Sequence, residues 1–87
     1  MSNTMKEYKL VVDGMFGKWE TVGETPDAYG MQRLKQLIVR NIAVTWCSLV
    51  GALEAKARLV DDAREFGFNL PVRVVMRVVT DWQTVNK

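Results

Sequence analysis

The chain has 87 residues, a length that is enough for one globular domain and too short for two. Of these residues, 48% are hydrophobic and 25% are charged. Twelve basic and ten acidic residues leave a net charge of +2, and this balance marks neither a strongly basic nucleic-acid binder nor an acidic mimic of DNA. A core of this size stabilises a fold only narrowly, and small domains often add stability by pairing with a second copy. We therefore expect a homo-oligomer, most simply a homodimer.

The single cysteine, Cys47, excludes a disulfide within the chain and favours a reducing compartment. The first residues lack the basic start and apolar run of a signal peptide, and no segment has the roughly 18 apolar residues of a membrane helix. We expect a cytoplasmic protein with no membrane partner. We also expect residues 1–6 to form a flexible N-terminus and residues 7–87 to form a single domain.

The first regular segment alternates between apolar and polar residues. Over residues 7–13, Tyr8, Leu10 and Val12 fall on one face of an expected strand. Residues 14–17 supply two glycines for a tight connection, and residues 18–24 alternate again. This order predicts an N-terminal β-hairpin.

The middle of the chain predicts two helices. Thr25 is a suitable cap and Pro26 a suitable first helical residue for a helix that fades near residues 40–41. Ser48 can cap a second helix over residues 49–66, and Gly67 is a suitable C-terminal stop. The residues expected on the inner face of the second helix are Leu49, Leu53, Ala57, Val60 and Ala63.

Residues 42–47 are ambiguous because their β-branched content favours a short strand, whereas the helical stripe of the preceding segment continues in phase through them. We favour a strand or an extended link, with one long helix as the alternative. Residues 71–82 predict the final strand, with Val72, Val74, Met76, Val78, Thr80 and Trp82 on one face and Arg73, Val75, Arg77, Val79 and Asp81 on the other.

The predicted fold class is therefore α+β, with the order β-β-α-(β)-α-β. It has a small antiparallel or mixed sheet and two helices packed on one face of that sheet. The alternative is a hairpin, one long kinked helix and a C-terminal strand.

Residues for catalysis are scarce. The chain has no histidine, which removes the commonest general base and metal ligand. The densest acidic group, Asp61, Asp62 and Glu65, is interpreted as a solvated helix face, and Cys47 as a residue packed in the core. The glycine spacing fits no phosphate-binding loop. We expect no enzyme, no catalytic residue, no metal and no cofactor.

The residues that favour a protein partner are arginines interleaved with apolar side chains, because exposed aromatic and apolar groups beside arginine are typical of interface hot spots. The candidate partner-binding residues are Arg73, Val75, Arg77 and Val79 on the last strand, together with Met15, Phe16 and Phe68 in turns.

Nucleic-acid binding is the alternative function. Arg73 and Arg77 share one face of the last strand, and Lys9 on the first strand is placed to join them. The acidic residues expected on the same face make this the less favoured hypothesis.

Residues 63–67 (AREFG) followed by residues 72–82 (VRVVMRVVTDW), together with residues 17–23 (GKWETVG), resemble small phage-encoded α+β accessory proteins of unknown function. The resemblance covers about half of the chain and consists of strand patterns. It implies a phage accessory protein that acts on a host or phage protein in the cytoplasm of the host cell. We therefore expect a non-enzymatic protein that works by protein–protein binding, for example on a host factor or defence system.

Overall fold

The computed structural model describes residues 4–14 and 18–80, and these form an α+β fold. Two helices accompany two small antiparallel sheets, as the sequence predicts at the level of fold class. In chain order the elements are β1 (Thr4–Val12), β2 (Glu20–Thr21), α1 (Ala28–Ile42), α2 (Leu49–Glu65), β3 (Phe68–Asn69) and β4 (Val72–Thr80).

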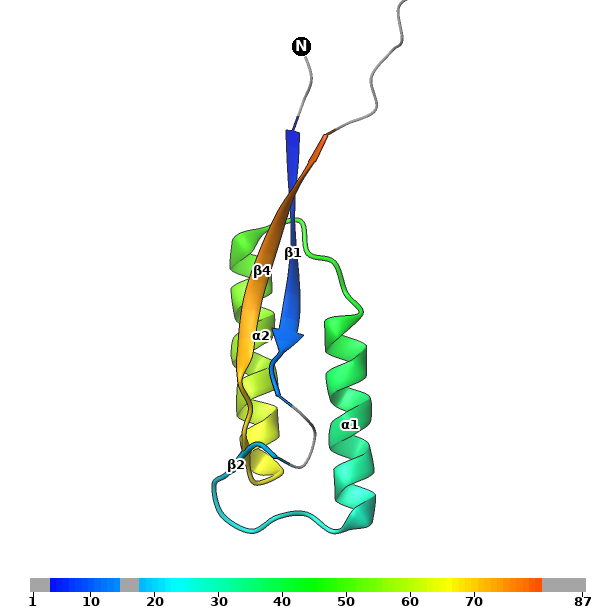
Figure 1. Ribbon diagram of the computed structural model, residues 1–87, viewed down its shortest axis with the longest axis vertical. Helices are drawn as coiled ribbons and strands as arrows, with labels where there is room; N and C mark the ends of the chain where they lie inside the picture. The colour runs from blue at the N-terminus through cyan, green and yellow to red at the C-terminus, as the bar shows by residue number, and fades with distance from the viewer. Residues whose placement is uncertain (1–3, 15–17, 81–87) are drawn as a thin grey trace, which may run out of the picture.

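The main sheet is a long two-stranded ribbon made by the first and last strands (Figure 1). β1 and β4 run antiparallel in nine consecutive residue pairs, from Thr4 opposite Thr80 to Val12 opposite Val72. The predicted N-terminal hairpin is therefore wrong. The strand also begins at Thr4, so the predicted boundary of a flexible terminus at residue 6 falls inside it.

Residues 18–24, the second segment of the expected hairpin, do not pair with β1. They contribute only β2, which pairs with β3 in a two-residue sheet. Trp19 explains this placement, because its ring is buried, meets Phe68 edge-on at 6.2 Å between centroids, and donates from Nε1 to the Asp13 carbonyl at 2.8 Å. Packing against the chain beyond α2 therefore replaces pairing with β1, while β4 offers β1 a much longer partner.

Helix α1 begins two residues later than Thr25 and Pro26 suggest. Asp27 is the N-cap, and its side chain accepts a hydrogen bond from the Gly30 amide at 2.8 Å. An aspartate in this position also carries negative charge at the positive end of the helix dipole. The helix buries Leu34 and Ile38 against the ribbon and ends at Ile42.

The ambiguous residues 42–47 form neither a full strand nor a continuation of the helix. Residues after Ala43, the C-cap of α1, leave the helical conformation, and Trp46 makes an isolated antiparallel bridge with Tyr8 of β1. Two hydrogen bonds of 2.8 Å form this bridge, one from each backbone amide to the other residue's carbonyl. The extended link therefore contacts the outer edge of β1 at one point.

Helix α2 starts and stops close to where the sequence predicts, but only part of its predicted inner face is covered, because Ala63 is buried and Val60 partly buried while Ala57 is exposed. Ser48 caps it by accepting from the Gly51 amide at 2.9 Å, while Leu49 and Leu53 are each 47% exposed. The buried residues are Ala52, Ala55, Leu59 and Ala63. The three alanines let the helix approach the ribbon closely, and the spacing of the four residues fits a helical stripe as well as the predicted one does.

Gly67 ends α2 as predicted, and its backbone explains why. Its φ is +89°, in the region that favours glycine, and a Cβ at this position would collide with the Glu24 carbonyl oxygen. The Val22 amide also donates to the Gly67 carbonyl at 2.8 Å. This glycine therefore fixes the turn from α2 into β3 against the segment before α1.

The core lies between the two helices and one face of the ribbon. It is built from Leu10, Trp19, Leu34, Ile38, Ala55, Leu59, Ala63, Phe68, Leu70 and Val72. Cys47 is exposed in the link between the helices, so its predicted packing in the core is wrong. Trp46 is the side chain of the link that packs against the core, and its neighbour Cys47 points away because successive residues of an extended segment face opposite sides.

The two faces of the ribbon follow the predicted alternation. The inner face consists of the even-numbered residues, which include Leu10 and Val72 in the core. Figure 1 shows that α1 and α2 accompany only part of the ribbon and that its end at Thr4 and Thr80 extends past them. None of the helices in the described part of the chain is long and apolar enough to cross a membrane.

Candidate functional site

The candidate site is the outer face of the ribbon, which we define as the odd-numbered residues of its two strands. The cross-strand pairs on this face are Met5–Val79, Glu7–Arg77, Lys9–Val75 and Val11–Arg73. Val11, Val75 and Val79 are partly buried by their neighbours, whereas Lys9, Arg73 and Arg77 are exposed. An apolar strip therefore runs between charged groups, as the pattern of the last strand predicts.

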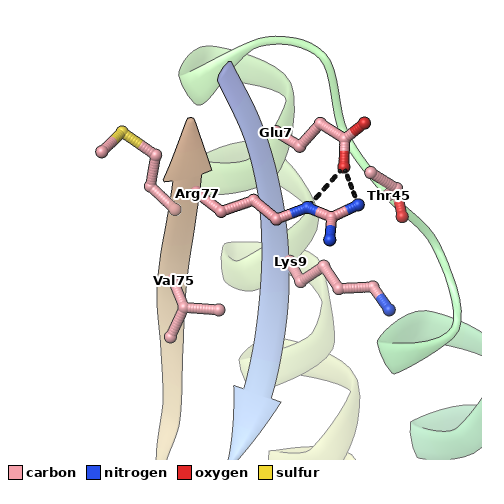
Figure 2. A pocket seen from close by; sticks show the side chains of 6 residues that line it. Glu7, Lys9, Thr45, Val75 and Arg77 are labelled. Carbon is pink, nitrogen blue, oxygen red and sulfur yellow. Dashed lines mark hydrogen bonds and ion pairs between the residues drawn. The ribbon is translucent and has the colours of Figure 1, made fainter. Parts of the chain in front are cut away.

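The centre of this face is an ion pair between the two strands. Arg77 extends from β4 across β1, where Nε and Nη2 lie 2.9 and 2.8 Å from Oε2 of Glu7 (Figure 2). Glu7 and Arg77 are directly opposite in the ladder, which is the arrangement in which opposite charges stabilise a sheet. The Glu7 side chain is only 25% exposed, so the pair holds Arg77 in a defined position.

A second ion pair lies at the other end of the face. Nε of Arg73 lies 3.0 Å from Oδ1 and 2.9 Å from Oδ2 of Asp13, just beyond the end of β1. Both arginines that suggested a basic face therefore have a carboxylate partner. The face carries three positive side chains and one negative side chain, and Asp13 beyond its end reduces the local net charge to +1.

A shallow hollow of about 180 Å³ adjoins the Glu7–Arg77 pair. Its lining residues are Glu7, Lys9, Thr45, Val75, Met76 and Arg77. Thr45 comes from the link between the helices, so the hollow lies where the two-strand ribbon meets that link (Figure 2). The mixture of one apolar wall, a hydroxyl and fixed charges can receive a single side chain of a partner and hydrogen bond to its backbone.

The structure brings together four of the seven predicted partner-binding residues. Arg73, Val75, Arg77 and Val79 share the outer face, while Met15 and Phe16 lie outside the described residues. Phe68 does not belong to a surface, because its side chain is 2% exposed and packs on Trp19. The position of Phe68 just after a helix predicts partial exposure, but the β2–β3 sheet and α2 enclose it.

Two contributors to the site were missed, Glu7 and Thr45. The local sequence pattern places Glu7 in a hairpin with residues 18–24, whereas the structure pairs it with a residue 70 positions away. The available signal was the similar length of the two alternating segments, with acidic residues on one and basic residues on the other. Thr45 had no signal, because only the Tyr8–Trp46 bridge places it beside the strands.

No group of three or more His, Cys, Asp or Glu side chains gathers as a potential metal site within residues 4–14 and 18–80. Comparisons with protein-family models, with curated proteins and with solved structures found no match to this chain. The outer face of the ribbon must therefore be interpreted from its own chemistry.

Proposed function

We propose that this chain is a small non-enzymatic accessory protein of phage type that acts by binding another protein through the outer face of its ribbon. The observation that carries the proposal is the Glu7–Arg77 pair beside the hollow, set in a strip of partly buried valines. Arginine with apolar neighbours is the composition of interface centres. The phage context and the host-cell cytoplasm rest on the resemblance of the strand patterns.

The electrostatics of the face also indicate the chemistry of the partner. Glu7 engages Nε and Nη2 of Arg77, so the remaining guanidinium N–H groups can donate to a partner. The Lys9 ammonium has no ion pair among the described residues. A partner that offers backbone carbonyls or a carboxylate beside an apolar side chain fits this face best.

The proposal is tested by capture from a bacterial lysate with two variants of equal charge change. Lys9→Ala/Arg77→Ala alters the outer face, and Arg33→Ala/Lys35→Ala removes the same charge from α1. We expect a defined protein to be retained by the wild type and the α1 variant and lost with the outer-face variant. Equal capture by all three, with both variants folded by circular dichroism, would contradict the proposal.

Nucleic-acid binding is a second candidate function. The distribution of charge favours α1, and not the sheet, as the surface that would bind. Residues 28–42 contain Arg33, Lys35 and Arg40 and no acidic residue, so this helix carries +3 and the rest of the chain, whose total is +2, carries −1. Gln32 and Gln36 are exposed on the same helix, and such amides can contact base edges.

Fluorescence anisotropy with duplex DNA and single-stranded RNA tests this candidate. Binding should weaken steeply with salt, and Arg33→Ala/Arg40→Ala should reduce both affinity and salt slope. Arg73→Ala/Arg77→Ala is the matched control, because it removes equal charge from groups already paired with carboxylates. Equal weakening by both variants would mean that the arginines of the sheet also take part in binding. Failure to bind either nucleic acid would exclude this function.

A further inference from the structure

One edge of β4 has hydrogen-bonding groups that no other strand within residues 4–14 and 18–80 uses. Tyr8 directs its amide and carbonyl away from β4, toward Trp46, so Tyr8 and Met76 form a non-hydrogen-bonded pair in the ladder. The amide and carbonyl of Met76 therefore point away from β1, and the same alternation applies to Val74 and Val78. Among the described residues, no strand pairs with this edge.

The inner face of β4 loses its cover along the strand. Val72 is 8% exposed and Val74 is partly buried, but Met76 is 52% and Val78 is 57% exposed. This change matches the view in Figure 1, in which the ribbon extends past the helices. The uncovered end therefore offers an open backbone edge together with two adjacent apolar side chains on one face.

Such an edge is normally protected. Edge strands usually carry lysine, proline, a bulge or an inward charge that prevents pairing with another chain, and a two-stranded ribbon surrounded by water is only marginally stable. β4 has no proline or lysine between Val72 and Thr80, and its nine pairs with β1 are uninterrupted. Its two arginines lie on the outer face, where they do not block the edge.

We propose that a second copy of this chain pairs with the uncovered end of β4, antiparallel and around a two-fold axis at Val78. Val78 then lies opposite Val78 of the second copy, and Met76 lies opposite Thr80 of the second copy. The result is a continuous four-stranded sheet in the order β1–β4–β4–β1. This inference does not depend on the proposed function, because it concerns only association of the chain with itself.

The arginines disfavour two other registers of this strand pair. With the axis at Val78, Arg77 lies opposite Val79 of the second copy. Moving the axis by one residue to Arg77 would place the two Arg77 side chains directly opposite each other, and an axis at Val75 would oppose Arg73 and Arg77. Like charges in opposite positions destabilise a sheet.

The helices explain why pairing is confined to the end of the strand. A two-fold axis perpendicular to a sheet leaves the helices of both copies on the same face. Helix α2 contacts β4, the edge strand, and paired strands lie only about 4.8 Å apart, whereas packed helices need about 8–10 Å. Pairing along the whole of β4 would make the two α2 helices collide, while pairing along residues 76–80 places them end to end.

Association also accounts for the exposed apolar groups on the inner face. Directly opposite side chains in an antiparallel sheet lie about 5 Å apart, so the two Val78 side chains would meet at the axis. Met76 of each copy would flank this contact. The second copy therefore covers the part of the inner face that α1 and α2 leave open.

The chain offers a closely matched pair of variants for the test. Val78 and Val39 are both valines with 57% exposure, but Val39 lies on the outer side of α1. Analytical ultracentrifugation of purified protein from low micromolar to millimolar concentration should show a reversible monomer–dimer equilibrium. Val78→Lys should weaken it by more than about tenfold, whereas Val39→Lys should leave it unchanged.

Two residue-level measurements make the geometry testable. Exchange of the Val78 amide with solvent should slow as the protein concentration rises, because that amide becomes bonded across the dimer. Cys47 is the single cysteine and is exposed, so a nitroxide label there should report one inter-copy distance. A monomer at all concentrations, a dimer lost equally with Val39→Lys, or an unprotected Val78 amide in a dimer would each overturn the proposal.

Discussion

The two ends of the β1–β4 ribbon have the same alternating pattern but different surroundings. At one end, Leu10 and Val72 are 2% and 8% exposed because α1 and α2 cover this part of the ribbon. At the other end, Met76 and Val78 occupy the same face and are more than half exposed. Alternation thus determines which side chains share a face, and the reach of the helices determines which of them are buried.

This difference separates two roles within one sheet. The covered end supplies the core and determines whether the chain folds. The uncovered end adds little to the core but exposes an open edge and an apolar surface, which are properties of a contact surface. Stability should therefore respond strongly to changes at one end and weakly at the other.

The largest effect should come from truncating the covered end. Leu10→Ala should lower the free energy of unfolding by about 2–5 kcal/mol, because it removes buried methyl groups and leaves a cavity. Val78→Ala at the uncovered end should change it by only about 0.5 kcal/mol at protein concentrations where the chain is monomeric. Urea unfolding followed by circular dichroism measures both. Equal losses would mean that the two ends do not differ as described.

Parts of this division could be predicted from the sequence. Alternation over nine residues is a local signal that predicts β4, and Ser48 and Gly67 predict the two ends of α2. The phase of α2 could not be determined, since stripes through Leu53 and through Leu59 both fit a helix. Only contact with the ribbon chooses Leu59 as the buried residue.

The partner of β1 depends on long-range packing. Residues 7–13 are equally suited to pair with any strand, and the nearby glycines favoured a hairpin. The choice of β4 depends on nine cross-strand pairs and on Trp19 being held by Asp13 and Phe68. In the same way, the outer face could be identified from β4 alone, but the Glu7–Arg77 pair could not.

The second effect concerns the turn that closes the covered end. Gly67→Ala should lower stability by about 2 kcal/mol or more, because the new Cβ meets the Glu24 carbonyl and the residue keeps a positive φ. Gly23→Ala is the control, since Gly23 has a φ of +105° but no atom within 4 Å of the added Cβ. In thermal unfolding, the Gly67→Ala variant should have a lower melting temperature than the Gly23→Ala variant. The same loss in both would show that backbone conformation alone accounts for the effect.

The third effect concerns how far α2 reaches toward the uncovered end. Ser48→Ala should reduce stability by about 1 kcal/mol and speed exchange of the Gly51 amide, because that amide loses its acceptor. Asp27→Ala removes the equivalent bond to the Gly30 amide of α1 and serves as the comparison. Each variant should increase exchange only in the first turn of its own helix. Faster exchange in both helices from one variant would contradict independent caps.

The smallest effect should come from the ion pairs of the outer face. Glu7→Gln keeps the shape of the side chain but removes its charge, and it should cost less than about 1 kcal/mol because Arg77 is largely exposed. Asp13→Asn should cost still less, since the Asp13 side chain is 48% exposed and the Glu7 side chain 25%, so water and salt screen the Arg73–Asp13 pair more. Unfolding in low and high salt should show that the wild-type advantage over Asp13→Asn disappears with salt, while part of the advantage over Glu7→Gln persists. The reverse order would mean that Arg77 is not held by Glu7 in solution, and the hollow beside it would then lack the fixed charge on which the proposed partner binding depends.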